Sequence, residues 1–333
     1  MSAGKLLLFG NVSQPPYCNN LFPPVRAFQK IFRTTVVEPQ RFAGFVTTGG
    51  ARPTLIPDNA VIENTDPSPD VVVCLGGALH FSKRALRIFA KETVLAGFAL
   101  SDPYGLPASL MIAPQFDLFY TQDWQTVTDY AALDIRVRRC DPATDPELYR
   151  PMRLEPDCDI LYYGKWTPQR NDLVAALSAR FRVRVHAYAG EKRWSVPVLP
   201  QVDTPETLCA AINRSRLVLE TALLDDAEGK YRGALHVTPR VFFAASCGVP
   251  CLIESFPGLE KFFDPGAEVV AATSKEDLLE QAGRLLADEA SRSAMGRRAR
   301  QRALRDHTWD RRVESFLLDL RQWRSQPHPR PTR

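Results

Sequence analysis

The sequence has no run of about 18 or more consecutive apolar residues, so it predicts no membrane-spanning helix. It also has no C-x-x-C pair, and its seven cysteines and five histidines are not spaced as zinc ligands are. The cysteines are scattered, several of them within apolar runs, which favours small buried side chains in a reducing, cytoplasmic environment. No G-x-G-x-x-G follows the first predicted strand, so a dinucleotide-dependent oxidoreductase is the least favoured class.

Positive charge is mild overall but unevenly distributed. The 333 residues carry a formal net charge of +4. From Ser291 to the end there are twelve arginines and four acidic residues, a balance of +8, so the preceding residues together carry −4. Two interpretations remain open: a solvated helix face with a frayed tail, or a patch that contacts an anionic acceptor or a membrane surface.

Apolar, β-branched runs alternate with helical patterns along the whole chain, which is typical of parallel sheets in an α/β protein. In the first half, strands are expected at residues 5–9, 34–37, 70–75, 93–100 and 118–121, and helices at 24–32, 82–91 and 124–132. In the second half, strands are expected at 159–163, 183–188, 217–221 and 249–254, and helices at 171–181, 204–213, 238–246, 274–286 and most of 289–323.

A break in regular structure is expected at residues 141–151, where two Asp-Pro steps are followed by a third proline. The chain is long enough for two domains. We therefore expect Rossmann-like domains at residues 1–150 and 151–310, then a closing helix at 311–324 and a disordered tail at 325–333. If the two domains face a central cleft, the loops that follow their strands border it, and ligands of α/β folds bind at such loops.

The stretch from Thr238 to Glu254 reads T-P-R-V-F-F-A-A-S-C-G-V-P-C-L-I-E and predicts a helix followed by a buried strand. Thr238 is a good N-cap residue, and Pro239 suits the first helical position. The free N–H groups and the positive dipole end of such a helix suit a diphosphate, and Arg240 would add a planar cation for its oxygens. The alternative is an ordinary strand–helix–strand unit whose Arg240 pairs with a neighbouring acid.

This stretch, R-V-F-x-A-A-x-C-G-V-P-x-L followed by G-L-E-x-F-F, resembles the donor-binding region of GT-B glycosyltransferases. It resembles most closely the CgeB-like (spore-maturation) glycosyltransferase family. Further likenesses follow in order between about Asp70 and Leu318: Ser101-Asp-Pro103, Phe116–Asp123, residues 142–151, Asp159–Gly164 with Arg170, and His307-Thr-Trp309. The resemblance implies the GT-B fold and transfer of a sugar from a nucleotide-diphosphate sugar, with UDP as the expected nucleotide. The acceptor is not identified, and both nucleic acid and protein remain open.

The resemblance also implies which residues of the second half bind the donor. Gly164 and Lys165 are expected beside the phosphates or the transferred sugar, and Arg170 is placed in the same site. Lys165 would neutralise charge that develops on the leaving diphosphate, although a surface lysine is the alternative. His236, just before Thr238, is a further candidate for contact with the donor phosphate.

One position departs from the family pattern. A glutamate usually stands where this chain has Phe243, and that glutamate is expected to hold the hydroxyls of the donor ribose. A phenyl ring cannot accept those hydrogen bonds. Either another group binds the ribose, with Glu254 and Glu260 as the nearest candidates, or donor binding is altered or lost.

In the first half, Asp102 is the first candidate for an acceptor-side acid or base, because it closes a buried strand before a proline. A cap on the next turn is the alternative. His80 is the second candidate base. The D-x-D of Asp157 and Asp159 leads into a domain-opening strand and not into a nucleotide-sugar setting, so a metal-independent reaction is expected, with side-chain cations and a helix end in place of Mg²⁺.

Two other functions stay open. Phe243 favours a protein that retains the fold and binds nucleotide sugars without catalysis. The arginine-rich C-terminal segment favours a glycosyltransferase that acts on modified DNA bases, in which case DNA binding should weaken steeply with salt. No cofactor is expected beyond the nucleotide-sugar co-substrate.

Overall fold

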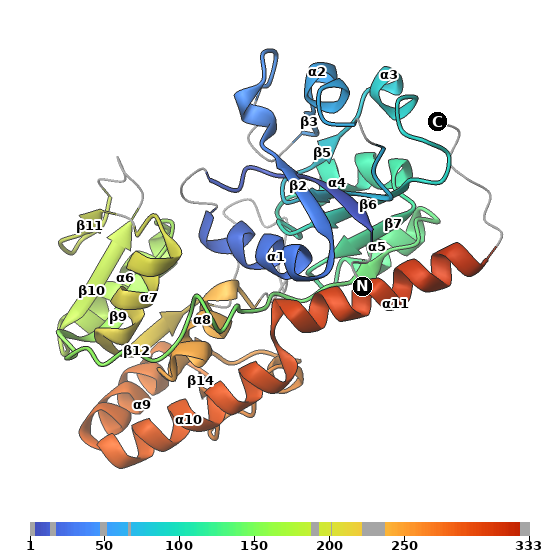
Figure 1. The fold of residues 1–333 in the computed structure, drawn as a ribbon. Coiled ribbons are helices and arrows are strands. Elements are labelled where there is room, and N and C mark those ends of the chain that lie inside the picture. Colours follow the sequence, from blue (N-terminus) through green and yellow to red (C-terminus); the bar gives the residue numbers. More distant parts are fainter. Residues whose placement is uncertain are drawn as a thin grey trace. The chain divides into compact units, whose positions relative to one another are not determined.

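The computed structural model describes residues 4–13, 18–46, 52–65, 68–187, 193–200, 202–221 and 237–326. The chain divides into two compact units (Figure 1). The first comprises Met1–Asp141 together with Trp309–Arg333, and the second comprises Pro142–Thr308. The division therefore falls earlier than residue 150, and the last helix belongs to the N-terminal unit.

The first unit is built on a six-stranded parallel sheet in the order β2-β1-β4-β6-β7-β8. Its strands are β1 (Lys5–Phe9), β2 (Arg33–Val37), β4 (Val71–Leu75), β6 (Val94–Ala99), β7 (Leu118–Thr121) and β8 (Arg138–Arg139). The central strands β4 and β6 are buried along their whole length, as expected for continuous apolar runs covered on both faces. A separate two-stranded parallel sheet pairs β3 (Thr54–Leu55) with β5 (Leu79–His80).

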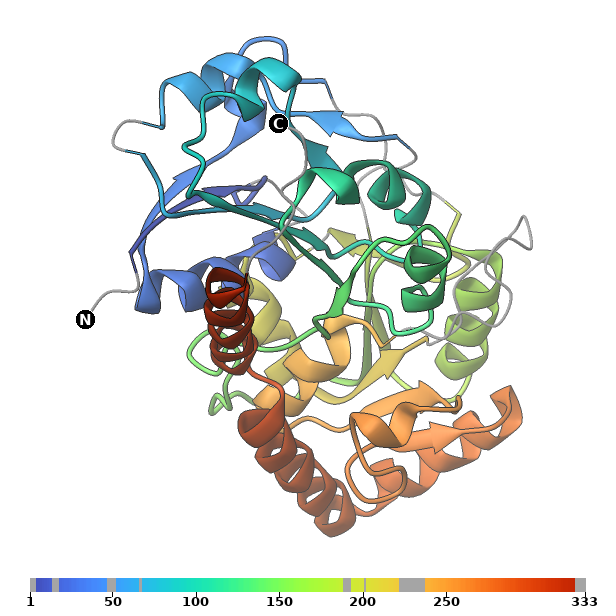
Figure 2. The same ribbon diagram turned by 90° about the vertical axis from the view of Figure 1, so that its right-hand side faces the viewer.

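Helices of the first unit are α1 (Cys18–Ile31), α2 (Asp58–Ile62), α3 (Lys83–Leu86), α4 (Leu106–Ile112), α5 (Val127–Ala132) and α11 (Trp309–Ser325). Figure 2 shows α11 in dark red beside α1 in blue. The rings of Phe28 and Phe316 meet edge to face with centroids 5.4 Å apart, and Lys30 pairs with Asp310 at 2.9 Å. The C-terminal helix thus completes the core of the N-terminal unit.

The second unit repeats the plan with a parallel sheet in the order β11-β10-β9-β12-β13-β14. Its strands are β9 (Cys158–Tyr163), β10 (Val183–Ala187), β11 (Leu199–Pro200), β12 (Ser215–Glu220), β13 (Cys251–Glu254) and β14 (Val270–Ala272). Its helices are α6 (Pro168–Ser178), α7 (Pro205–Asn213), α8 (Pro239–Cys247), α9 (Lys275–Ala287) and α10 (Glu289–Asp306). The first strand, β9, has β10 on one side and β12 on the other, so the strand order reverses between β9 and β12.

The predicted α/β class with parallel sheets is confirmed, since every strand pairing among the described residues is parallel. Six cysteines are free and buried, which agrees with the expectation of small buried side chains: Cys74, Cys140, Cys158, Cys209, Cys247 and Cys251. None of the helices in the described ranges combines the length and the apolar character needed to cross a bilayer. Residues 327–333 of the expected tail lie outside the described residues.

Candidate functional site

The candidate site lies at the carboxyl ends of β9 and β12 in the second unit. In open α/β sheets, the crevice beside the point where the strand order reverses is the usual place for a ligand. Gly164 and Lys165 directly follow β9, Thr221 directly follows β12, and Arg170 lies in the first turn of α6. Arg240 lies in the first turn of α8, the helix that precedes β13. The fold therefore gathers most of the C-terminal candidates at one edge.

Gly164 allows the guanidinium of Arg240 to lie against the backbone. Its φ of +145° is a conformation that side chains rarely adopt. A Cβ at this position would be 2.8 Å from Nη2 of Arg240 and 3.1 Å from the hydroxyl oxygen of Tyr162. The glycine expected beside a ligand is therefore required first of all by contacts within the protein.

Arg170 joins the loop after β9 to the end of β12. Its Nε donates to Oγ1 of Thr221 at 2.9 Å, and its Nη1 donates to the carbonyl of Lys165 at 3.3 Å. Thr167 caps the same helix, since its hydroxyl accepts from the backbone N–H of Arg170 at 3.2 Å. The side chain of Lys165 is exposed. Two cations and the N-terminus of α6 thus meet at this edge.

Arg240 is buried in an ion pair with an acid of the neighbouring strand. Only 9% of it is exposed, and its Nη1 lies 2.9 Å from Oε2 of the fully buried Glu220. Its Nη2 donates to the carbonyl of Tyr163 at 2.7 Å, and the guanidinium lies over the rings of Tyr162 and Tyr163, 5.2 and 4.9 Å from their centroids. Burial acts to lower the pKa of Arg240, but Glu220 and the tyrosines raise it above its ordinary value, so the group stays charged.

The charge of Arg240 is therefore matched inside the protein. This pairing matches the alternative that the sequence left open, in which Arg240 pairs with a neighbouring acid, and it holds the ends of β9 and β12 together. Thr238 supports the arrangement: it donates its hydroxyl proton to Oε2 of Glu220 at 2.5 Å and accepts from the backbone N–H of Arg240 at 3.3 Å. The expected N-cap at Thr238 is confirmed.

The other C-terminal candidates are dispersed. Glu254 ends β13 and is partly buried, whereas Oε2 of Glu260 accepts from the backbone N–H of Gly258 at 3.0 Å. Phe243 faces the core, where its ring stacks on Tyr149 with centroids 4.0 Å apart and an interplanar angle of 9°. His236 lies outside the described residues.

Asp102, the acid or base expected in the N-terminal half, has no exposed surface. Its Oδ1 accepts from Ser109 at 2.8 Å, and its Oδ2 accepts from Thr121 at 2.9 Å and from Tyr130 at 2.7 Å. Burial raises its pKa to about 6, although the three hydroxyl donors act to lower it. These contacts tie the turn after β6 to α4, β7 and α5, so the geometry favours a structural role over a catalytic one.

His80 does not join Asp102. It ends β5 in the small two-stranded sheet, is partly buried, and is not among the hydrogen-bond partners of Asp102. Burial lowers the pKa of His80, although a hydrogen bond with the backbone of Phe81 acts to raise it. Within the described ranges the two acceptor-side candidates therefore share no hydrogen bond.

The D-x-D carboxylates lie at the amino end of β9, opposite the candidate site. Asp157 pairs with Arg184 at 2.6 Å, and Asp159 pairs with Arg182 and Arg216, both at 3.1 Å. Within the described ranges, no group of three or more His, Cys, Asp or Glu side chains has the arrangement of a metal site. These two carboxylates are thus committed to arginines at another edge of the sheet.

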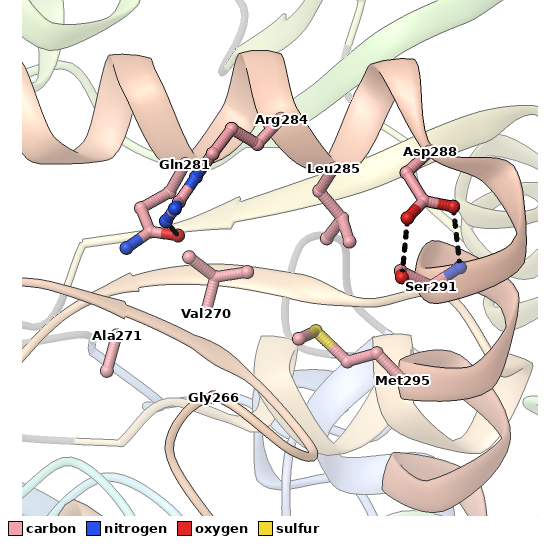
Figure 3. A pocket seen from close by; sticks show the side chains of 9 residues that line it. All are labelled: Gly266, Val270, Ala271, Gln281, Arg284, Leu285, Asp288, Ser291 and Met295. Atoms are coloured by element: carbon pink, nitrogen blue, oxygen red, sulfur yellow. Dashed lines mark hydrogen bonds between the residues drawn. The ribbon is translucent and has the colours of Figure 1, made fainter.

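A pocket of about 220 Å³ lies elsewhere in the second unit, among β14, α9 and α10 (Figure 3). Its polar side chains are satisfied within the protein: Arg284 bonds Gln281, and Asp288 caps α10 by accepting from the backbone and hydroxyl of Ser291. Val270, Leu285 and Met295 supply much of its apolar lining. None of the candidate site residues lines it.

Glu220 and Thr221 are site residues that the sequence does not single out. Both occur in the apolar run that predicts a strand at residues 217–221, and their position at its carboxyl end is the signal that could have identified them. Glu220 is fully buried. Its partners Thr238 and Arg240 belong to the start of α8 and come after residues 222–236 in the sequence. Sequence spacing alone does not indicate such a pairing.

Residues 169–318 match the family model described as glycosyl transferase-like. No curated protein matches the chain significantly in sequence. Among solved structures, a sucrose-phosphate synthase from Thermosynechococcus elongatus aligns with a TM-score of 0.63 at 12% identity, covering 96% of this chain and 99% of the other. Anabaena HepE in complex with UDP and glucose aligns with a TM-score of 0.61 at 13% identity, covering 96% and 100%.

A third similar structure is an alpha-glucosyltransferase in complex with UDP and a 13-mer DNA containing a HMU base. It aligns with a TM-score of 0.68 at 9% identity and covers 95% of this chain and 99% of that one. At such identities the likeness establishes the fold, which is the GT-B fold that the sequence predicts. With the family match, it defines the class of the protein as a glycosyltransferase.

Proposed function

We propose that the protein transfers a sugar from a nucleotide-diphosphate sugar, with UDP as the nucleotide, and that the donor binds at the carboxyl ends of β9 and β12. The convergence of Lys165, Arg170 and Thr221 at this edge carries the proposal. Two of the similar structures are UDP complexes, which supports UDP. The ordered motifs from Asp70 to Leu318 favour the CgeB-like family within the class.

Lys165 and Arg170 are the cations that we assign to the diphosphate. The guanidinium of Arg240 is compensated by Glu220. Within the described ranges, Arg170 donates to the hydroxyl of Thr221 and to the carbonyl of Lys165, and the side chain of Lys165 is exposed. Charge that develops on the departing diphosphate is stabilised when preorganised cations and helix N-termini lie beside it. We propose that these groups supply that stabilisation without a metal ion.

The test is a panel of UDP-, GDP- and TDP-sugars, with binding measured by calorimetry and turnover measured as released nucleotide. Lys165→Met should lower kcat/KM by about 100-fold or more, the effect of losing one preorganised electrostatic contact. Lys91→Met, an exposed lysine of the other unit, is the matched control and should leave kcat/KM unchanged. A panel with neither binding nor turnover would refute the proposal. Binding without turnover would favour the catalytically silent alternative.

A second candidate function places modified DNA bases in the acceptor role. The observation that favours it is α10, whose six arginines and two acidic residues give a balance of +4. Arg297 and Arg298 are exposed on this helix, and one structure of similar fold contains DNA. Duplex binding through phosphate contacts should weaken steeply as salt rises. An affinity for duplex DNA that does not change between low and high salt would exclude this acceptor.

A further inference from the structure

Within the described part of the chain, one of the two carboxylate oxygens of Glu220 has contacts and the other has none. Glu220 ends β12 and has no exposed surface. Its Oε2 accepts from the hydroxyl of Thr238 at 2.5 Å and lies 2.9 Å from Nη1 of Arg240. Its Oε1 is buried too, but it has no hydrogen-bond partner within the described part of the chain.

Arg240 does not satisfy this second oxygen. Its Nη2 donates to the carbonyl of Tyr163, and its Nη1 lies 2.9 Å from Oε2 in an ion pair. Neither Nη1 nor Nε makes a hydrogen bond in the described part of the chain. The two tyrosine rings that border the guanidinium limit its movement toward Oε1. A buried polar atom left without a partner calls for an explanation, because native proteins satisfy nearly all such atoms.

The position of Glu220 indicates what kind of group could satisfy Oε1. The next residue, Thr221, receives the hydrogen bond of Arg170, so Glu220 ends its strand at the same sheet edge as the cations that we assign to the diphosphate. A phosphate oxygen is itself an acceptor and carries negative charge, so it cannot serve. Hydroxyl groups, of the ribose or of the transferred sugar, are hydrogen-bond donors that a nucleotide sugar carries close to its phosphates.

We propose that Oε1 of Glu220 accepts a hydrogen bond from a hydroxyl group of the bound nucleotide sugar and so contributes to donor recognition. This inference rests on the proposed function. Within the pair, Arg240 and Thr238 hold Oε2, and the carboxylate is thereby oriented with one acceptor left for the ligand. The ion pair then serves recognition as well as packing.

The experiment compares binding of UDP, 2′-deoxy-UDP, 3′-deoxy-UDP and UDP-glucose to the wild-type protein and to Glu220→Gln by calorimetry. The hydroxyl of Thr238 donates and the guanidinium of Arg240 is a cation, so both favour the amide oxygen at the Oε2 position and the NH₂ group where Oε1 was. The acceptor becomes a donor. Affinity should fall by about 10- to 100-fold, the range for a hydrogen bond to a charged group. Glu206→Gln, an exposed glutamate of the same unit, is the control and should change nothing.

The arms of the experiment distinguish the two hydroxyl sources. If the ribose supplies the hydroxyl, one of the deoxy nucleotides binds the wild type more weakly than UDP, and Glu220→Gln weakens that nucleotide no further. If the transferred sugar supplies it, Glu220→Gln weakens UDP-glucose but not UDP. Unchanged affinity for both UDP and UDP-glucose overturns the assignment.

If Glu220→Gln does not fold, the deciding measurement is the affinity of the wild-type protein for a series of ligands. Equal wild-type affinity for UDP, its 2′- and 3′-deoxy forms and UDP-sugars that lack single sugar hydroxyls overturns the assignment, whereas a loss of about 10-fold for one of them supports it. Failure of the wild type to bind any nucleotide sugar would overturn the proposed function itself. The two failures are therefore distinguishable.

Discussion

The buried carboxylate of Asp102 makes a prediction about how stability depends on pH. Burial raises its pKa from 3.8 to about 6 in the folded protein. The folded state therefore holds the proton more tightly than the unfolded state, and stability declines as pH rises from about 4 to about 6. A pKa difference of about 2 units corresponds to about 3 kcal/mol in full, of which about 2.5 kcal/mol separates pH 4 from pH 7 because the unfolded carboxyl is already partly ionised at pH 4.

Asp102→Asn removes the titration while preserving the shape of the side chain. Its hydroxyl partners can rotate to accept from the amide as well as donate to it. The wild type minus the variant gives a difference in the free energy of unfolding. This difference should be about 2.5 kcal/mol larger at pH 4 than at pH 7. The difference between variants, rather than either curve, is decisive because other groups titrate in the same window.

The assay is urea denaturation at half-unit pH steps from 4 to 7.5, followed by tryptophan fluorescence. Asp134→Asn is the control, since Asp134 is exposed in the same unit and its left-handed φ of 55° is one that asparagine also adopts. Its difference from the wild type should stay flat with pH. If the difference in free energy of unfolding between the wild type and Asp102→Asn does not change with pH, or favours the wild type more at pH 7, the raised pKa of Asp102 is refuted.

Three further predictions concern the second unit. Arg240→Met should lower the free energy of unfolding of the second unit by about 3–5 kcal/mol, because Glu220 would stay buried without its cation. A loss below about 1 kcal/mol in urea titrations would contradict the burial of this ion pair. Gly164→Ala should lower the free energy of unfolding by about 1–3 kcal/mol and the affinity for UDP by at least about 10-fold, because its Cβ would displace Arg240. An unchanged affinity in calorimetry would show that this loop does not contact the donor. Phe243→Glu should lower the melting temperature and gain no donor affinity, because the carboxylate would be buried against Tyr149; tighter nucleotide binding would show that this position reaches the ligand.

Much of the fold could be predicted because its signals are local. The buried parallel strands read as continuous apolar runs, and the N-cap residues Thr204, Thr238 and Ser274 begin helices as expected. The prediction was wrong where local signals were weak. The helix expected at residues 82–91 covers only Lys83–Leu86, and α4 was missed because Pro107 follows a turn-forming stretch. Tertiary packing decides such short elements.

The grouping of Gly164, Lys165 and Arg170 near the end of one strand could be predicted, but the pairing of Arg240 could not. The edge at the ends of β9 and β12 follows from strand order, and Gly164, Lys165 and Arg170 lie there. A sequence shows that Arg240 carries a charge but not whether that charge faces a ligand or a buried acid. The acid that neutralises it ends a strand whose apolar pattern hides it.

Because Glu220 neutralises Arg240, the positive charge that attracts a diphosphate is expected from other residues. A buried ion pair presents little net charge to a diphosphate, so attraction must come from the more accessible cations and from helix N-termini. Salt screens an exposed lysine more than a buried pair. Nucleotide affinity should therefore depend on ionic strength through Lys165, and this dependence should be weaker in Lys165→Met than in the wild type. Equal salt dependence in the two proteins would mean that Lys165 does not face the phosphates, and the assignment of the donor edge would then rest on Arg170 alone.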